Sequence, residues 1–138
     1  MAFAFIDRVL ECEAGERIVA LKALAFNEEY FRDHFPGMPV LPGAMILEGF
    51  VQAARQCLAA APGGHDLWAL VEVAQMRFNR FVVPGEVVRL EVERDKDGEG
   101  GAIWFRGRAY TGDEGVGRLR FAVRPRTSGE VDAGGTPA

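Results

Sequence analysis

The 138-residue chain has few of the residues that mark several protein classes. Its two cysteines, Cys12 and Cys57, lie far apart without metal-ligand spacing, so we expect free thiols in a reducing compartment and neither a disulfide framework nor a metal site. The formal net charge is −4, and no basic run with interleaved aromatic residues occurs, which argues against nucleic-acid binding. No segment reaches the roughly 18 consecutive apolar residues of a membrane-spanning helix. The N-terminus lacks the basic start of a signal peptide, so a cytoplasmic protein is expected.

The composition is that of a soluble globular domain, with 49% hydrophobic and 26% charged residues. This length fits one domain, which we assign to residues 1–124. Residues 125–138 show no hydrophobic periodicity, and we predict a disordered tail there.

One long helix is predicted over Leu41–Ala61. Pro42 suits a first helical turn, because its missing N–H has no partner there, and Pro62-Gly63-Gly64 ends the run. The helix is apolar nearly all round, which is typical of a helix that other structure wraps.

Runs of alternating or apolar residues, separated by glycine-rich turns, predict about six strands. They are Phe3–Leu10, Arg17–Phe26, Leu67–Phe78, Glu86–Arg94, Ala102–Tyr110 and Val116–Val123. One helix and a meander of strands indicate an α+β fold in which an antiparallel sheet curls around the helix. A single layer around one helix leaves an open face, so a homodimer is expected.

The segment from His34 to Gln52, HFPGMPVLPGAMILEGFVQ, gathers residues that carry chemistry. His34 is one of only two histidines and stands in a proline-rich turn. It can be an ordinary loop residue, or it can act as a general base, since a neutral imidazole is available near pH 7.

Glu48 is a carboxyl group among apolar neighbours. It can belong to a solvated polar stripe with Gln52 and Arg55, at helical spacing. Alternatively, apolar surroundings disfavour ionisation of a carboxyl group and suit a general acid. Gly43 lies in the first helical turn, where free backbone N–H groups can hold an oxygen that gains negative charge. Base, acid and oxyanion site together are what β-elimination next to a carbonyl requires.

At these residues the chain resembles the FabZ-type 3-hydroxyacyl-[acyl-carrier-protein] dehydratases, which have the hotdog fold. The segments FIDRVLE, HFPGMPVLPGAMILEGFVQ and RFNRFVVPGEVVRLEVE carry the resemblance. It implies dehydration of (3R)-3-hydroxyacyl thioesters without metal or cofactor, with His34 as the base and Glu48 as the acid. It also implies that Gly43 binds the thioester carbonyl and that Gln52 supports Glu48. A glutamate at the acid position, in place of the aspartate of the FabA branch, favours dehydration without isomerisation.

The resemblance further implies partners. The family forms dimers, often assembled into hexamers, and the histidine and glutamate of one site come from opposite subunits. Its carrier protein is acidic, and the best candidates to meet it are Arg77 and Arg80, then Arg55.

Two other functions stay open. One is thioester hydrolysis on the same fold, and the other is a non-catalytic module that binds acyl-carrier protein. Asp33 and Phe81 depart from the usual family residues beside the site, so they bear on the acyl group accepted and on the basicity of His34.

Overall fold

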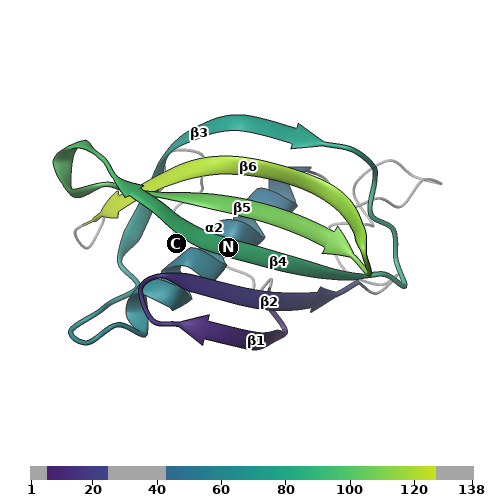
Figure 1. Cartoon of the computed structure of the whole chain (residues 1–138), viewed down its shortest axis with the longest axis horizontal. Helices are drawn as coiled ribbons and strands as arrows, with labels where there is room; N and C mark the ends of the chain where they lie inside the picture. The colour runs from purple at the N-terminus through teal and green to yellow at the C-terminus, as the bar shows by residue number, and fades with distance from the viewer. Residues whose placement is uncertain (1–5, 25–42, 127–138) are drawn as a thin grey trace.

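A computed structural model describes residues 6–24 and 43–126 (Figure 1). In chain order it contains strands β1 (Arg8–Glu13) and β2 (Arg17–Ala23), helix α2 (Gly43–Ala59), and strands β3 (Trp68–Phe78) and β4 (Val87–Asp97). A short 3-10 turn, η1 (Glu99–Gly101), and strands β5 (Ile103–Thr111) and β6 (Glu114–Pro125) complete it. Every predicted element lying in the described residues therefore overlaps an observed one, and the first strand is displaced most, since it runs over Arg8–Glu13 where Phe3–Leu10 was predicted.

The strands form one six-stranded sheet in the order β1-β2-β4-β5-β6-β3, and every neighbouring pair is antiparallel. The sheet curves over α2, which runs along its inner side (Figure 1). The predicted α+β architecture, about six strands wrapped around one helix, is confirmed. The chain passes from the end of α2 to β3 at one edge of the sheet, while β1 forms the opposite edge.

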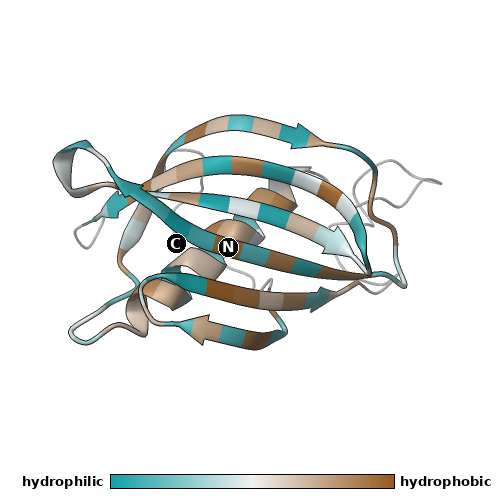
Figure 2. Ribbon diagram, viewed as in Figure 1, coloured by the Kyte–Doolittle hydropathy of each residue, from teal (hydrophilic) through white to brown (hydrophobic). Residues whose placement is uncertain are grey.

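The core lies between one side of the helix and the inner face of the sheet. Along β4 and β5 apolar and polar residues alternate, as the bands of Figure 2 show, so that one set of side chains is buried. Phe50 of α2 is fully buried, and its ring lies against Gly107 of β5, where an added Cβ would come within 2.8 Å of it. Phe121 of β6 packs between Phe50 and Phe105, with ring centroids 6.4 and 5.7 Å away. A glycine on the strand thus makes room for the largest side chain of the helix.

The helix ends where the sequence predicts. Gly63 has a φ of +72°, a left-handed conformation that favours glycine, and a Cβ on Gly64 would lie 2.2 Å from the carbonyl oxygen of Leu58. The turn between β1 and β2 also reaches this end, because the Gly15 N–H donates to the Cys57 carbonyl at 2.9 Å. The last helical carbonyls are therefore bonded both by the chain that follows, where the Ala61 N–H donates to the Leu58 carbonyl at 3.3 Å, and by the β1–β2 turn.

Strand β6 is longer than predicted. Arg124 and Pro125 pair with Ala69 and Trp68, and the Arg126 N–H donates to the Leu67 carbonyl at 3.0 Å. The remainder of the predicted tail, 127–138, lies outside the described residues. Within the described part of the chain, no helix is long and apolar enough to cross a membrane.

Candidate active site

Three of the four predicted site residues lie on α2, and the fourth, His34, lies outside the described residues. Gly43 is the first residue of the helix, Glu48 follows more than one turn later, and Gln52 follows Glu48 by one turn. An α-helix rises about 1.5 Å per residue, so Glu48 is about 7.5 Å along the axis from Gly43. Side chains on a helix lean toward its N-terminus, which brings the Glu48 carboxyl group nearer to the helix start.

Glu48 and Gln52 are hydrogen-bonded to each other. The Gln52 amide Nε2 donates to Glu48 Oε1 at 3.3 Å, and both side chains are half-buried. Arg55, the third member of the polar stripe, is also half-buried and donates from Nε to the Trp68 carbonyl at 3.0 Å. The stripe predicted from the helical spacing exists, but it is not a fully solvated face.

A cavity of about 280 Å³ opens at the start of α2. Apolar side chains form much of its wall, and its described lining consists of Gly43, Ile46, Phe78, Asn79, Arg80 and Phe81. The Phe78 ring lies so close to Gly43 that an added Cβ would meet Phe78 Cε2 at 3.0 Å. Phe81, a position singled out in the sequence analysis, is 67% exposed beside this cavity. Glu48 and Gln52 are not among the described residues that line it.

Arg80 is bonded to neighbouring groups within the fold. It pairs with Glu86, donates to Thr111 Oγ1 at 2.8 Å, and has its Nε 3.1 Å from a carboxylate oxygen of Glu114. The hydrogen bond from Arg80 lowers the pKa of Glu86, whose carboxylate also accepts from the Val83 N–H at 3.0 Å. The network fixes the segment between β3 and β4. Of the arginines considered for a carrier protein, Arg77 is exposed, whereas Arg80 and Arg55 are bonded to neighbouring groups.

The two cysteines lie close together, which their sequence separation did not suggest. Cys57 is fully buried in the core, and Cys12 of β1 is exposed. Burial, with a smaller contribution from the neighbouring Cys12 thiol, raises the pKa of Cys57 to about 11. Cys57 is thus a core residue, as expected, and both thiols are free. Among the described residues no group of three or more potential ligands is placed to hold a metal ion.

Comparison with known families gives a match over most of the chain. The FabA-like domain family matches residues 1–120. A 3-hydroxyacyl-[acyl-carrier-protein] dehydratase FabZ of Moorella thermoacetica is 45% identical over 125 residues, covering 88% of this chain and 86% of that protein. A protein of the same name from Verminephrobacter eiseniae is 38% identical over 135 residues, covering 94% of this chain and 89% of that protein.

Solved structures share the fold at low sequence identity. A Streptococcus mutans protein, smu.793, determined with acetyl CoA bound, matches with a TM-score of 0.69 at 10% identity, covering 91% of this chain and 92% of that one. The dehydratase heterocomplex ApeI:P from Xenorhabdus doucetiae matches with a TM-score of 0.62 at 21% identity, covering 86% of this chain and 97% of that one.

Proposed function

The chain belongs to the FabZ-type 3-hydroxyacyl-[acyl-carrier-protein] dehydratases of the FabA-like family, and from this premise we propose the reaction and the roles of its residues. The substrate is a (3R)-3-hydroxyacyl thioester on acyl-carrier protein, and the products are the trans-2-enoyl thioester and water. His34 is the base, Glu48 is the acid, and the helix start at Gly43 binds the thioester carbonyl. No metal or redox cofactor takes part. The observation that carries the proposal is the arrangement of Gly43, Glu48 and Gln52 along α2 in a chain of this family.

The spacing along α2 suits a substrate whose reacting groups are the carbonyl C1 and the hydroxyl on C3. A carbonyl oxygen at the Gly43 end accepts from a backbone N–H that has no helical partner. The hydroxyl lies two carbons further along the acyl chain, in the direction of Glu48. Two hydrogen bonds and this short carbon chain span a distance similar to the axial rise of about 7.5 Å between the two residues.

The hydrogen bond from Gln52 prepares Glu48 for the role of acid. A protonated carboxyl group has one carbonyl oxygen, which accepts, and one hydroxyl, which donates. Because Gln52 donates to Oε1, that oxygen serves as the acceptor and the proton resides on Oε2. Gln52 thereby aims the acidic proton away from itself and toward the leaving group.

The elimination balances in protons and electrons. His34 takes the proton from C2, and the electron pair of that C–H bond forms the C2=C3 double bond while the C3–O bond breaks. The hydroxyl leaves with the Glu48 proton as water, and the Gly43 N–H stabilises the charge that develops on the carbonyl oxygen. Glu48 is then ionised and His34 protonated, so a proton passes from the imidazole to the carboxylate before the next turnover.

The same family membership leads us to propose a homodimer that can assemble further into a hexamer. In the described chain β3 pairs with β6 only, so its outer edge presents unpaired backbone groups. Val71 and Met76 on this strand are 37% and 49% exposed. Antiparallel pairing of β3 with the same strand of a second copy would cover this edge and join the two sheets. The two free thiols agree with a cytoplasmic location.

The proposed reaction is tested with purified protein and two carrier-protein thioesters, 3-hydroxybutyryl and 3-hydroxydecanoyl, each product being followed by mass. We expect the loss of one water. His34→Ala and Glu48→Gln should each lower the rate by at least about 100-fold, the usual contribution of a general acid or base. Glu99→Gln, which neutralises an exposed carboxylate outside the site, is the matched control and should keep the activity.

The outcomes separate the alternatives. Free acid in place of the enoyl product would show a hydrolase, and carrier binding without either product would show a non-catalytic module. Water loss that survives in both His34→Ala and Glu48→Gln would support dehydration as the reaction but overturn the roles assigned to these two residues. A difference in rate between the two acyl lengths gives the chain-length preference.

A further inference from the structure

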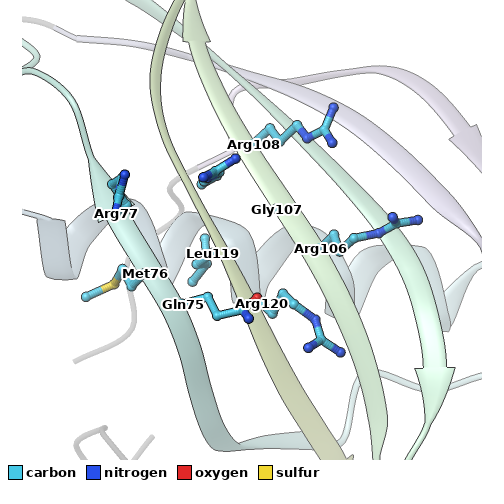
Figure 3. Close-up of a pocket in the computed structure, with 9 residues that line it drawn as sticks. Gln75, Met76, Arg77, Arg106, Gly107, Arg108, Leu119 and Arg120 are labelled. Carbon is cyan, nitrogen blue, oxygen red and sulfur yellow. The ribbon is translucent and has the colours of Figure 1, made fainter.

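Five arginines surround one cavity on the outer face of the sheet, opposite the side that packs on α2 (Figure 3). Arg106 and Arg108 of β5 alternate with the buried Phe105 and Ala109, so their side chains project from the other face. The cavity measures about 520 Å³. The residues that supply its positive charge come from three neighbouring strands and are Arg77, Arg106, Arg108, Arg118 and Arg120. We refer to this set as the arginine groove.

The strand register sets these like charges directly opposite one another. Arg106 pairs with Arg120, and Arg108 pairs with Arg118, across the β5–β6 ladder. Arg118 also pairs with Arg77 across the β3–β6 ladder. Like charges at directly opposed positions of a sheet are destabilising. On its other side β5 pairs with β4, which sets Glu93 opposite Arg106 and Glu91 opposite Arg108. The repulsion that a bound anion would relieve is therefore concentrated at Arg118 and Arg77.

Carboxylates neutralise only part of the groove. Glu93 lies 2.8 Å from Arg106 Nη2 and Asp95 lies 2.7 Å from Arg120 Nη2. Arg77, Arg108 and Arg118 are exposed, and no described carboxylate lies within 4.0 Å of them. The groove keeps an excess of three positive charges, in a chain whose formal net charge is −4. This face of the sheet thus carries a local excess of positive charge, although the chain as a whole is negatively charged.

A bulge in β3 adds to the recess beside the arginines. Gln75 and Met76 fall between the pairs Ala74–Arg120 and Arg77–Arg118, where β6 supplies the single residue Leu119. Gln75 has a φ of +56°, a conformation that is unfavourable for a residue with a side chain. Gln75 and Met76 both line the cavity, so the strained turn of the backbone shapes its wall.

We propose that the arginine groove binds a small ligand that carries two or more neighbouring phosphate groups. Guanidinium groups bind phosphate oxygens through paired, charge-assisted hydrogen bonds. Arginines on adjacent strands, whose backbones lie about 4.8 Å apart, suit phosphates that follow one another in a chain. A volume of about 520 Å³ is that of a small-molecule site, which favours such a ligand over the broad surface of an acidic protein.

The groove is distinct from the cavity at the helix start, although it includes Arg77, which was considered above for the carrier protein. No described residue lines both the arginine groove and the cavity at Gly43. The phosphates can belong to inorganic pyrophosphate, to a nucleoside triphosphate or to coenzyme A, and all three share the chemistry that the groove recognises.

The experiment is isothermal titration calorimetry of the intact chain at low ionic strength, with pyrophosphate, ATP and coenzyme A as separate probes. We expect saturable binding of at least one probe with a dissociation constant below about 1 mM. Arg118→Gln should weaken it by about 10-fold, because it removes the guanidinium that faces both Arg108 and Arg77. Arg8→Gln removes the same charge from the exposed strand at the opposite edge of the sheet, and should change the affinity by less than about twofold.

Each result decides the proposal. Equal binding of all three probes shows recognition of the phosphates alone, whereas a preference for ATP or coenzyme A identifies the source. The absence of saturable binding up to about 1 mM for every probe would overturn the proposal, as would equal weakening in Arg118→Gln and Arg8→Gln. Since Arg118→Gln relieves repulsion, its melting temperature should equal or exceed that of the parent. If that variant does not fold, Arg108→Gln makes the same test.

Discussion

Replacing Gly117 by alanine should destabilise the fold more than any comparable change on the same strand. Gly117 is a buried residue of β6, and its backbone lies against the ring of Phe78. A Cβ added there would lie 2.3 Å from Phe78 Cδ1, 2.8 Å from Phe78 Cε1 and 2.9 Å from the Arg77 carbonyl oxygen. All three distances are shorter than van der Waals contact, so the ring or the strands must move.

The ring has little room to move away. Its opposite side faces the start of α2, where the Cβ position of Gly43 is 3.0 Å from Phe78 Cε2. The Arg77 carbonyl belongs to the backbone of β3, which pairs with β6 at this level. Overpacking of a core costs about 1–3 kcal/mol, and we expect about 3 kcal/mol here because the clash includes backbone on one side and a confined ring on the other. For a domain of this size that is a fall in melting temperature of about 10 °C.

Gly115→Ala is the matched control. It lies two residues earlier on β6, it is exposed, and nothing lies within 4 Å of an added Cβ. Its free energy of unfolding, measured by urea denaturation, should change by less than about 0.5 kcal/mol. Phe78→Leu in the Gly117→Ala background should recover part of the loss, since the smaller side chain leaves space for the new methyl group.

The Gly117 result also bears on the proposed site. Pressing Phe78 toward Gly43 narrows the cavity at the helix start, so the dehydration rate at low substrate concentration should fall. The reasoning would be refuted if Gly117→Ala destabilised the chain no more than Gly115→Ala, or if Phe78→Leu made the Gly117→Ala chain less stable still.

Three further predictions concern titrating and hydrogen-bonded groups. Burial raises the pKa of Cys57 from its ordinary 9.0 to about 11. The contribution of this thiol to the free energy of unfolding is therefore fully present below pH 9 and is lost as the pH rises toward 11. Urea denaturation should show a loss of up to about 2.5 kcal/mol in the free energy of unfolding over this pH range. The same loss should be absent from Cys57→Ala. Glu86→Gln should lower the free energy of unfolding by about 2 kcal/mol at pH 7. Because the pKa of Glu86 is lowered in the fold, its carboxylate stabilises the chain above the ordinary pKa and loses this effect as the pH falls, so the deficit of the variant should shrink in acid. A deficit unchanged at pH 3 would contradict this prediction. Gln52→Leu should lower kcat about 10-fold at unchanged KM, since it frees the Glu48 proton to rotate; a change in KM alone would argue against that role.

The elements were predictable because their patterns are strong. In β4 the buried Val88, Leu90 and Val92 alternate with polar residues, and this period of two belongs to a half-buried strand. In α2 the apolar run is long and is followed by Gly63, whose positive φ ends it. The order of the strands was not predictable in the same way, because periodicity says which face is buried and nothing about which strand lies beside which.

The site was predictable only where its residues are close in sequence. Glu48 and Gln52 are one helical turn apart, so their contact follows from helix geometry alone. The bonding of Arg80 to Glu86 and Glu114 depends on how β3, β4 and β6 are arranged, so the sequence alone did not predict it. The contact of Cys12 with Cys57 likewise depends on β1 lying beside the end of α2. The prediction for His34 stays a prediction.

The arginine groove and the core are two consequences of one register. On β5 and β6 the inner positions hold Phe105, Gly107 and Phe121, and the outer positions between them hold arginines. A slip by one residue would bury the arginines and expose the aromatic rings, so packing against α2 forces the like charges into opposition. The arginine side chains project from the face opposite that core, so packing on α2 does not itself require arginine at these positions. Folding therefore does not require arginines at these outer positions. Binding of an anionic ligand, as proposed above, would account for their presence there.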